Sequence, residues 1–224
     1  MQLFNVLTHD EISEIRTIFA DLKWHELRNT KRDDLLRDTF LEVTAVDERL
    51  IPIIKILERV FFTTIVKNFV FCKEILSVKC QRFREGEGRE KLAGEMHVQN
   101  YKCDLSWALC INGKESYKGG DFIVHSGGFS RVANLEPGGM VIYKTGSATK
   151  ITTVTEGEKD IICGGIESFI PSHDSRETLY KLAEINELLR RTTEESEVLI
   201  ERDHADKMNQ SWHQLVRILS TKGL

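Results

Sequence analysis

The side chains of this sequence that could do chemistry are its seven histidines, its five cysteines and the acidic residues near them. Glu95 stands two residues before His97, and successive side chains of a strand point to opposite faces, so these two would share one face. Cys103, Asp104 and His125 follow soon after. Carboxylates, thiolates and imidazoles are metal ligands, so this stretch offers the right ligand types. The spacing alone does not fix their geometry.

Other motifs of catalysis and binding are missing. The five cysteines are an odd number with no C-x-x-C pair, which argues against a disulfide framework and against a thiolate zinc site. Reduced thiols in an intracellular, cytoplasmic protein are the expectation. His204 and His213 are nine residues apart, which is the wrong spacing for a zinc pair on a helix. A G-x-S-x-G string and a P-loop are both absent, and Gly86-x-Gly88 lacks the third glycine of a dinucleotide fingerprint.

Composition limits the partners. The chain has 224 residues, of which 41% are hydrophobic and 29% charged, as in one large globular domain. The net charge of −4 and the lack of a long basic block argue against nucleic-acid binding. The longest apolar stretch, residues 51–71, contains four charged side chains, so it predicts a core helix and not a membrane span. No secretory signal is recognised at the N-terminus.

Hydrophobic periodicity predicts helices, then strands, then helices. Thr8 to Glu11 has the form of a capping box and predicts a helix to about residue 22. Residues 24–46 are polar and irregular, and 47–71 predict one or two helices packed on a sheet. After Pro171 the helical period returns, in a helix near 175–191 and in a last helix that carries Trp212. The charge-rich stretch 190–206 between them is expected to be solvated.

Between these helices, short apolar runs separated by glycine and asparagine predict antiparallel strands. We place them at 77–84, 95–100, 104–111, 121–126, 130–135, 139–143, 149–155 and 160–169. The predicted fold class is therefore α+β: a double-stranded β-helix, or jelly roll, flanked by N- and C-terminal helices. We predict one integrated domain with a helical region at 1–75, the β core at 76–171 and C-terminal helices at 172–224.

Several strings in this order resemble the 2-oxoglutarate and iron(II)-dependent oxygenases, and within them the PKHD-type hydroxylases related to prolyl 4-hydroxylase. The resemblance covers nearly the whole chain. The strings that carry it are Val6-Leu7-Thr8-x-x-Glu11, Asp104-Leu105-Ser106, Tyr117-x-Gly119-Gly120-Asp121-Phe122, Pro137-Gly138-Gly139-Met140-Val141-Ile142-Tyr143, Thr152-x-Val154-Thr155-x-Gly157-x-Lys159 and Ser211-Trp212-His213.

The resemblance implies an iron site made of an H-x-D pair and a distal histidine. In this sequence His97 falls on the first histidine, but Gln99 replaces the aspartate and Thr149 replaces the distal histidine. Two of the three iron ligands are therefore missing. Glu95 and His125 are possible substitutes, because with His97 they would restore the ligand types.

The resemblance also implies that Lys159 and Tyr143 are cofactor-binding residues, with Lys159 pairing with the far carboxylate of 2-oxoglutarate. A lysine after a glycine turn is more usually solvated, so this role competes with a plain surface interpretation. With two ligands missing, the expectation is no binding, or only weak binding, of iron(II) and 2-oxoglutarate.

The sequence thus predicts an oxygenase-fold protein that has lost iron-dependent catalysis and serves as a binding or scaffold protein, with a protein partner or through self-association. An active 2-oxoglutarate-dependent hydroxylase with a non-standard metal site is the alternative. A structural component of a larger assembly is the second alternative. Nucleic acid and membranes are not expected as partners.

Overall fold

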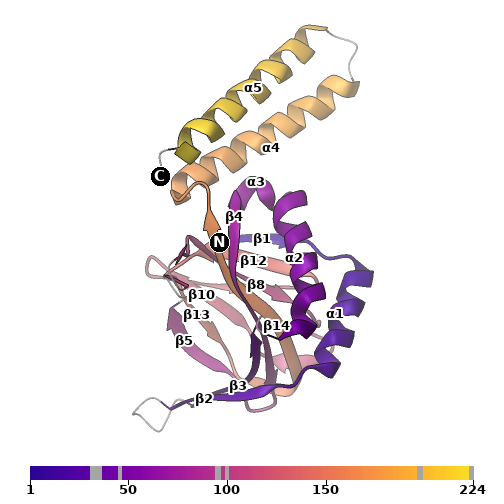
Figure 1. Ribbon diagram of the computed structural model, residues 1–224, viewed down its shortest axis with the longest axis vertical. Helices are drawn as coiled ribbons and strands as arrows, with labels where there is room; N and C mark the ends of the chain where they lie inside the picture. The colour runs from indigo at the N-terminus through magenta and orange to yellow at the C-terminus, as the bar shows by residue number, and fades with distance from the viewer. Residues whose placement is uncertain (31–36, 45–46, 94–96, 99–100, 196–198, 222–224) are drawn as a thin grey trace.

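The computed structural model describes residues 1–30, 37–44, 47–93, 97–98, 101–195 and 199–221. Two antiparallel sheets face each other, and helices cover the outer face of the larger sheet (Figure 1). The larger sheet has the strand order β1-β12-β8-β14-β4-β3-β2, with β9 paired to β14, and the smaller has the order β11-β10-β13-β5. Two packed sheets with flanking helices confirm the predicted α+β jelly roll.

The element bounds follow the chain. The strands are β1 (Gln2–Asn5), β2 (His25–Thr30), β3 (Arg37–Thr44), β4 (Cys72–Arg84), β5 (Arg89–Ala93), β6 (His97–Val98), β7 (Tyr101–Lys102), β8 (Leu105–Cys110), β9 (Tyr117–Gly119), β10 (Phe122–Ser126), β11 (Phe129–Ala133), β12 (Gly139–Lys144), β13 (Ala148–Ile151) and β14 (Val154–Ser168). The helices are α1 (His9–Asp21), η1 (Glu48–Leu50), α2 (Ile51–Thr63), α3 (Lys67–Val70), α4 (His173–Glu195) and α5 (Leu199–Thr221). None of the described helices is both long and apolar enough to cross a membrane.

Strand β14 divides the apolar side chains between two cores. It pairs with β4 from Glu158 to Ser168 and with β8 from Ile161 to Ile166. Because side chains alternate along a strand, Ile162 joins the core between the larger sheet and the helices, while Ile161 joins the core between the two sheets. We call the space between the two sheets the barrel interior.

The stretch 24–46 differs from the prediction of an irregular segment, because it contains β2 and β3, which extend the larger sheet beyond β4. Phe40 and Val43 lie three residues apart and therefore on opposite faces of β3, one in each core. The edge strand is β2, and side chains near a sheet edge can be polar, so the local composition does not reveal these two strands. The short strands β1, β5 and β9 were also not predicted. The predicted strand 95–100 lies partly outside the described residues.

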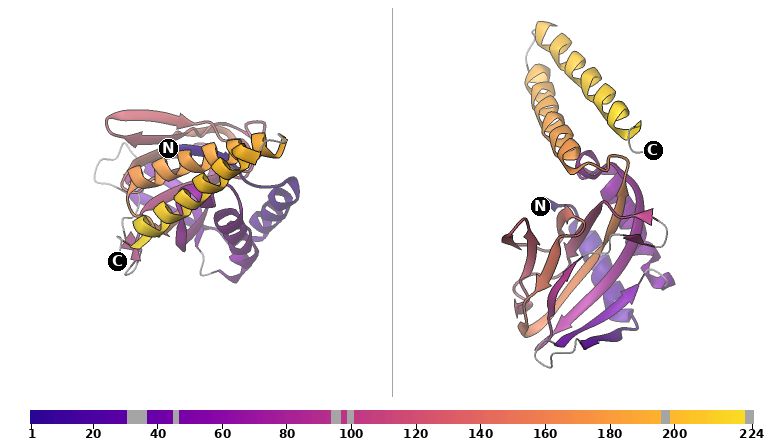
Figure 2. Two further views of the ribbon diagram at one scale, coloured as in Figure 1. Left: turned by 90° about the horizontal axis from the view of Figure 1, so that it is seen from above. Right: turned by 90° about the vertical axis from the view of Figure 1, so that its left-hand side faces the viewer.

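Helices α4 and α5 form a hairpin that projects from one end of the jelly roll (Figure 2). At its base, Arg176 is 1% exposed, and its guanidinium donates to the carbonyl of Ile170. The indole of Trp212 on α5 donates to the carbonyl of Leu179 on α4 at 3.2 Å. The bond of Trp212 joins α5 to α4. The bond of Arg176 joins α4 to the segment that follows β14.

The carboxylate of Glu11 ties the first helix to the second. It accepts hydrogen bonds from the Thr8 amide at 2.8 Å and from the Arg59 guanidinium at 2.6 and 2.7 Å. Burial would raise the pKa of Glu11, but the bonds from Thr8 and Arg59 outweigh it and lower this pKa. The capping box predicted from the sequence is confirmed.

We predict that Glu11→Gln lowers the free energy of unfolding at pH 7 by about 1 kcal/mol, since the charge-assisted contacts with Arg59 are lost while the glutamine can still accept from the Thr8 amide. The pKa of Glu11 is depressed in the folded state, so this stabilisation is present at neutral pH. It is lost as the pH falls through the folded-state pKa, and the two proteins then converge. Urea unfolding between pH 7 and 3 measures it, with the exposed Glu14→Gln as control. Equal stabilities at pH 7 would contradict the prediction.

Candidate functional site

The barrel interior contains a row of side chains from β14. Lys159, Ile161 and Cys163 alternate with outward-facing residues and so point inward together. Across the larger sheet Phe83 lies opposite Lys159, and Gln81 lies opposite Ile161. The smaller sheet contributes Val124 from β10, and Thr149 and Ile151 from β13. Val124 and Ile151 belong to the core of the interior, and Val124 is the register partner of Thr149.

Lys159 is buried, with 2% of the residue exposed, so the interpretation as a solvated lysine is wrong. Its ammonium donates to the hydroxyl of Tyr117 at 2.8 Å and lies 4.6 Å from the centre of that ring. Burial lowers the pKa of Lys159, because the charged form is desolvated. Tyr117 comes from β9, and burial followed by the nearby Cys110 raises the pKa of its hydroxyl.

Thr149, the residue at the expected position of the distal histidine, is 4% exposed and faces the interior. Its hydroxyl accepts a hydrogen bond from Nη2 of Arg89 at 3.1 Å, while Nη1 of Arg89 donates to Oε1 of Gln81 at 2.8 Å. Arg89 itself is 6% exposed. The local sequence does not identify this arginine as an interior residue, since it stands in a charged string after Gly88 that is typical of a solvated turn.

Tyr143 is also buried in the interior, with its ring centre 6.1 Å from that of Phe122. Burial is the largest cause that raises the pKa of its hydroxyl, and Cys163 adds to it. Arg89 and Thr149 act on the same hydroxyl in the opposite direction. The structure therefore brings Tyr143, Thr149 and Arg89 together in the interior that also holds Lys159.

The other candidate ligands are not brought to this place by the described residues. His97 lies in β6, paired with Lys102, while Glu95 and Gln99 fall outside the described part of the chain. His125 follows the inward-facing Val124 and so lies on the outer face of β10, where its Nδ1 is 2.6 Å from the hydroxyl of Ser130. Within the described ranges, no three His, Cys, Asp or Glu side chains gather in a way that could hold a metal ion.

Cys103 and Asp104 also have structural partners. The thiol of Cys103 donates to the carbonyl of Leu105 at 3.2 Å. Asp104 accepts from the Ser168 amide at 3.1 Å and pairs with the Lys102 ammonium at 3.1 Å.

The described part of the interior does not fit a divalent cation at Thr149. The guanidinium of Arg89 already places a positive charge against this hydroxyl, and like charges repel strongly where water is excluded. As a metal ligand, a threonine hydroxyl is neutral and does not offset that charge. We therefore derive no chemical step through iron at this position.

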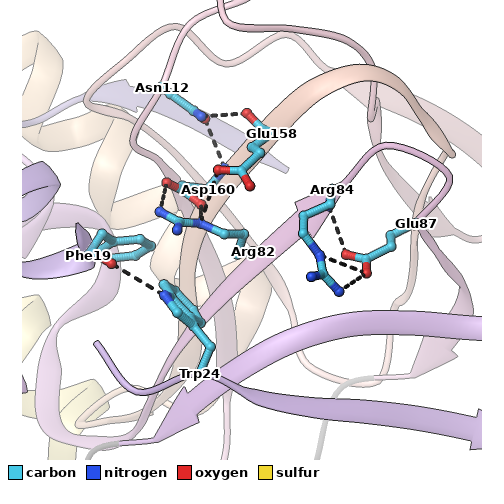
Figure 3. Close-up of polar contacts among 8 residues, drawn as sticks. All are labelled: Phe19, Trp24, Arg82, Arg84, Glu87, Asn112, Glu158 and Asp160. Carbon is cyan, nitrogen blue, oxygen red and sulfur yellow. Dashed lines mark hydrogen bonds and ion pairs between the residues drawn. The ribbon is translucent and has the colours of Figure 1, made fainter. Parts of the chain in front are cut away.

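A second polar cluster lies on the other face of β4 (Figure 3). The guanidinium of Arg82 binds the carboxylate of Asp160 in a bidentate pair at 2.7 and 2.8 Å and lies 4.8 Å from the ring centre of Trp24. The neighbouring Arg84 pairs with Glu87 at 2.7 Å. Each charge in this cluster has a partner of opposite sign, as in an ion pair that supports the fold.

The chain is similar in sequence to proteins named PKHD-type hydroxylase. One from Prochlorococcus marinus (strain MIT 9313) is 30% identical over 190 residues, which cover 79% of this chain and 84% of that protein. Against several others, at 28–29% identity, the match spans only 54–58% of their length. A comparison with models of protein families finds no match.

Solved structures show the same fold. A prolyl-4-hydroxylase from Pseudomonas putida superimposes with a TM-score of 0.52 at 12% identity, over 75% of this chain and 91% of that one. An oxidoreductase of the 2OG-Fe(II) oxygenase family from Burkholderia pseudomallei gives 0.51 at 12% identity, over 71% and 80%. Similarity at this level of identity concerns the fold alone.

We predict that Lys159→Met leaves the protein folded and raises its free energy of unfolding at pH 7 by about 1 kcal/mol, because a buried charge without a carboxylate partner is removed. The folded-state pKa of Lys159 is lowered, so between that pKa and 10.5 the unfolded chain binds more protons. The wild type therefore gains stability relative to the variant as the pH rises through this window. Chemical unfolding from pH 7 to 10 tests this.

The matched control is Lys118→Met, since Lys118 on β9 is exposed and pairs with the exposed Glu156. Its effect should stay within about 0.5 kcal/mol at every pH. A Lys159→Met variant that is clearly less stable than the wild type would mean that the ammonium is compensated inside the barrel.

Proposed function

The chain belongs to the PKHD-type hydroxylases, and from that membership we propose that it is a pseudoenzyme of the family: a binding or scaffold protein without iron-dependent catalysis. Relatives of this fold include a 2OG-Fe(II) oxygenase and a prolyl-4-hydroxylase.

The contact between Arg89 and Thr149 is the observation that carries this proposal. An iron ligand at this position would have to direct a lone pair at the iron. The threonine hydroxyl instead accepts a hydrogen bond from a guanidinium at 3.1 Å. Bringing a divalent ion to about 4 Å from that guanidinium costs about 4 kcal/mol for each unit of its charge, at an effective dielectric constant of about 20. The loss of the distal ligand and the gain of a fixed cation both lower the affinity of this position for iron(II).

An active hydroxylase with a non-standard metal site is the second candidate. It is favoured by the burial of Lys159, which keeps a basic residue in the interior where the far carboxylate of 2-oxoglutarate would be bound. It requires His97 together with a carboxylate such as Glu95, and Lys159 as the anchor of 2-oxoglutarate. His125 is a possible additional ligand, and its position on the outer face of β10 weighs against that role.

A binding role also needs a surface. A crevice of about 1080 Å³ opens between α2–α3 and the α4–α5 hairpin. The exposed apolar side chains of Phe62, Ile65 and Phe169 line it together with Trp212. Exposed apolar patches of this kind are typical of protein interaction sites. We propose that the protein self-associates through this crevice. A scaffold that binds a different protein there is the alternative.

The first test is iron binding. Titration calorimetry with iron(II) under anaerobic conditions, with 2-oxoglutarate present, is expected to show no stoichiometric binding, and turnover assays no succinate. Tight, stoichiometric iron that disappears in His97→Ala would contradict the proposal and establish the hydroxylase. In that case His125→Ala would show whether the outer-face histidine takes part.

The second test is the oligomeric state. Sedimentation of the wild type at about 50 µM is expected to show a dimer, and Ile65→Glu, which places a charge in the crevice, is expected to yield a monomer. Phe129→Glu is the matched control, since Phe129 is 75% exposed on β11, outside the crevice. A monomeric wild type would rule out self-association at this concentration.

A further inference from the structure

The side chain of Asn112 spans a place where β14 changes its partner strand. Along one edge, β14 pairs with β9 as far as Gly157 and with β8 from Ile161 onward. Residues 158–160 lie between these two pairings, and Asn112 stands in the turn that leads from β8 to β9. Its side chain therefore meets β14 where the turn takes the backbone of the partner strand away.

The Asn112 amide makes two hydrogen bonds to the backbone of β14 (Figure 3). Its Nδ2 donates to the carbonyl of Glu158 at 2.6 Å, and its Oδ1 accepts from the amide of Asp160 at 2.9 Å. One donor and one acceptor directed at the same strand edge are what the backbone of a neighbouring strand would supply. Asparagine can do this because its side chain carries both groups. We call these two hydrogen bonds the Asn112 clip.

The residue after Asn112 is Gly113, and this pair of residues is chemically labile. The backbone nitrogen of Gly113 can attack the side-chain carbonyl carbon of Asn112, since glycine has no Cβ to hinder the approach. A C–N bond then forms in a five-membered succinimide, the bond to Nδ2 breaks, and ammonia leaves. Water opens the ring to aspartate or isoaspartate, so that one water is consumed for each ammonia released.

The Asn112 clip opposes this reaction. To be attacked, the side chain of Asn112 has to turn toward its own backbone, but both of its polar atoms are held by β14. The reaction therefore needs the two hydrogen bonds to open first. Local opening of this kind is least frequent where a strand is paired on both edges, and β14 pairs with β4 through residues 158–160.

The product cannot re-form the clip. A carboxylate only accepts, so one of its oxygens would face the Glu158 carbonyl, where a donor now lies at 2.6 Å. The new negative charge would also lie beside Asp160, whose carboxylate already binds Arg82 at 2.7 and 2.8 Å. Isoaspartate adds a carbon to the main chain and displaces the turn. An acceptor left against another acceptor destabilises the folded state.

We propose that Asn112 is a site of spontaneous deamidation, that the Asn112 clip suppresses the reaction in the folded protein, and that the modification irreversibly loosens β14 at residues 158–160. The loosened segment includes Lys159, the buried lysine of the barrel interior. The reaction needs only water and does not depend on whether the interior binds iron. Its tests are therefore separate from those of the proposed function.

The rate of deamidation tests the protection. The full chain is incubated at pH 8 and 37 °C, in native buffer and in 6 M guanidinium chloride, and tryptic peptides are analysed by mass spectrometry. Peptide 103–114 contains Asn112, and the exposed Asn134, which is followed by leucine, is the internal control. In guanidinium chloride, Asn112 is expected to react at least tenfold faster than Asn134. In native buffer, the rate at Asn112 is expected to fall at least tenfold.

Gly113→Ala is the matched variant for the chemistry, because it leaves the clip residue in place and puts a methyl group beside the attacking nitrogen. The nearest atoms to this methyl group belong to the Glu115 carboxylate, the end of a flexible side chain that can move away. In guanidinium chloride, the variant is expected to deamidate at least fivefold more slowly than the wild type. This measurement does not require the variant to fold.

Asn112→Asp reproduces one product and tests the loosening. Hydrogen exchange of the amides at 158–160 is expected to be at least tenfold faster than in the wild type, while exchange at 164–166, which pair with both β8 and β4, stays unchanged. Asn134→Asp is the control and should match the wild type throughout. Equal rates of deamidation at Asn112 in native buffer and in guanidinium chloride would overturn the protection. Unchanged exchange at 158–160 in Asn112→Asp would overturn the loosening of β14.

Discussion

The alternation of side chains along β14 is the constraint on which the rest of the structure depends. This strand of 15 residues pairs with β4, β8 and β9, and it sends its apolar residues in turn to the helices and to the barrel interior. A shift of its register by one residue would move Lys159 out of the interior and expose one face of each core. The register of β14 therefore determines both the position of Lys159 and the packing of the helices on the larger sheet.

Fold and chemistry have separate determinants in this chain. The two cores contain the residues that specify the jelly roll, and few of them are polar. The polar residues of the interior can change without disturbing those cores. Thr149 and Arg89 illustrate this, because Thr149 pairs in regular register with Val124 of β10, and the pairing of β13 with β5 continues on both sides of an irregularity between Thr149 and Ile151. Membership of a family of hydroxylases thus says which fold is present and does not by itself say which reaction.

The sequence predicted the elements with strong local signals and missed those without them. The capping box at Thr8 and the apolar runs of β8, β10 and β12 were sufficient to place a helix and three strands, since period and burial agree there. Strand β5 was missed because most of its residues are charged and because its partner strand, β13, is far away in the sequence. For the same reason Arg89 could not be assigned to the interior. The inward direction of a charged side chain is a property of the sheet, not of the local string.

The α4–α5 hairpin is attached to the jelly roll at one end only and extends away from the sheets (Figure 2). The backbone hydrogen bonds of the hairpin can therefore open without opening the sheets. Amide hydrogens in the hairpin would exchange with solvent at a rate set by local opening, while those of β14 would wait for global unfolding. The chain would then consist of two cooperative units of unequal stability, joined where Arg176 is buried beside Ile170.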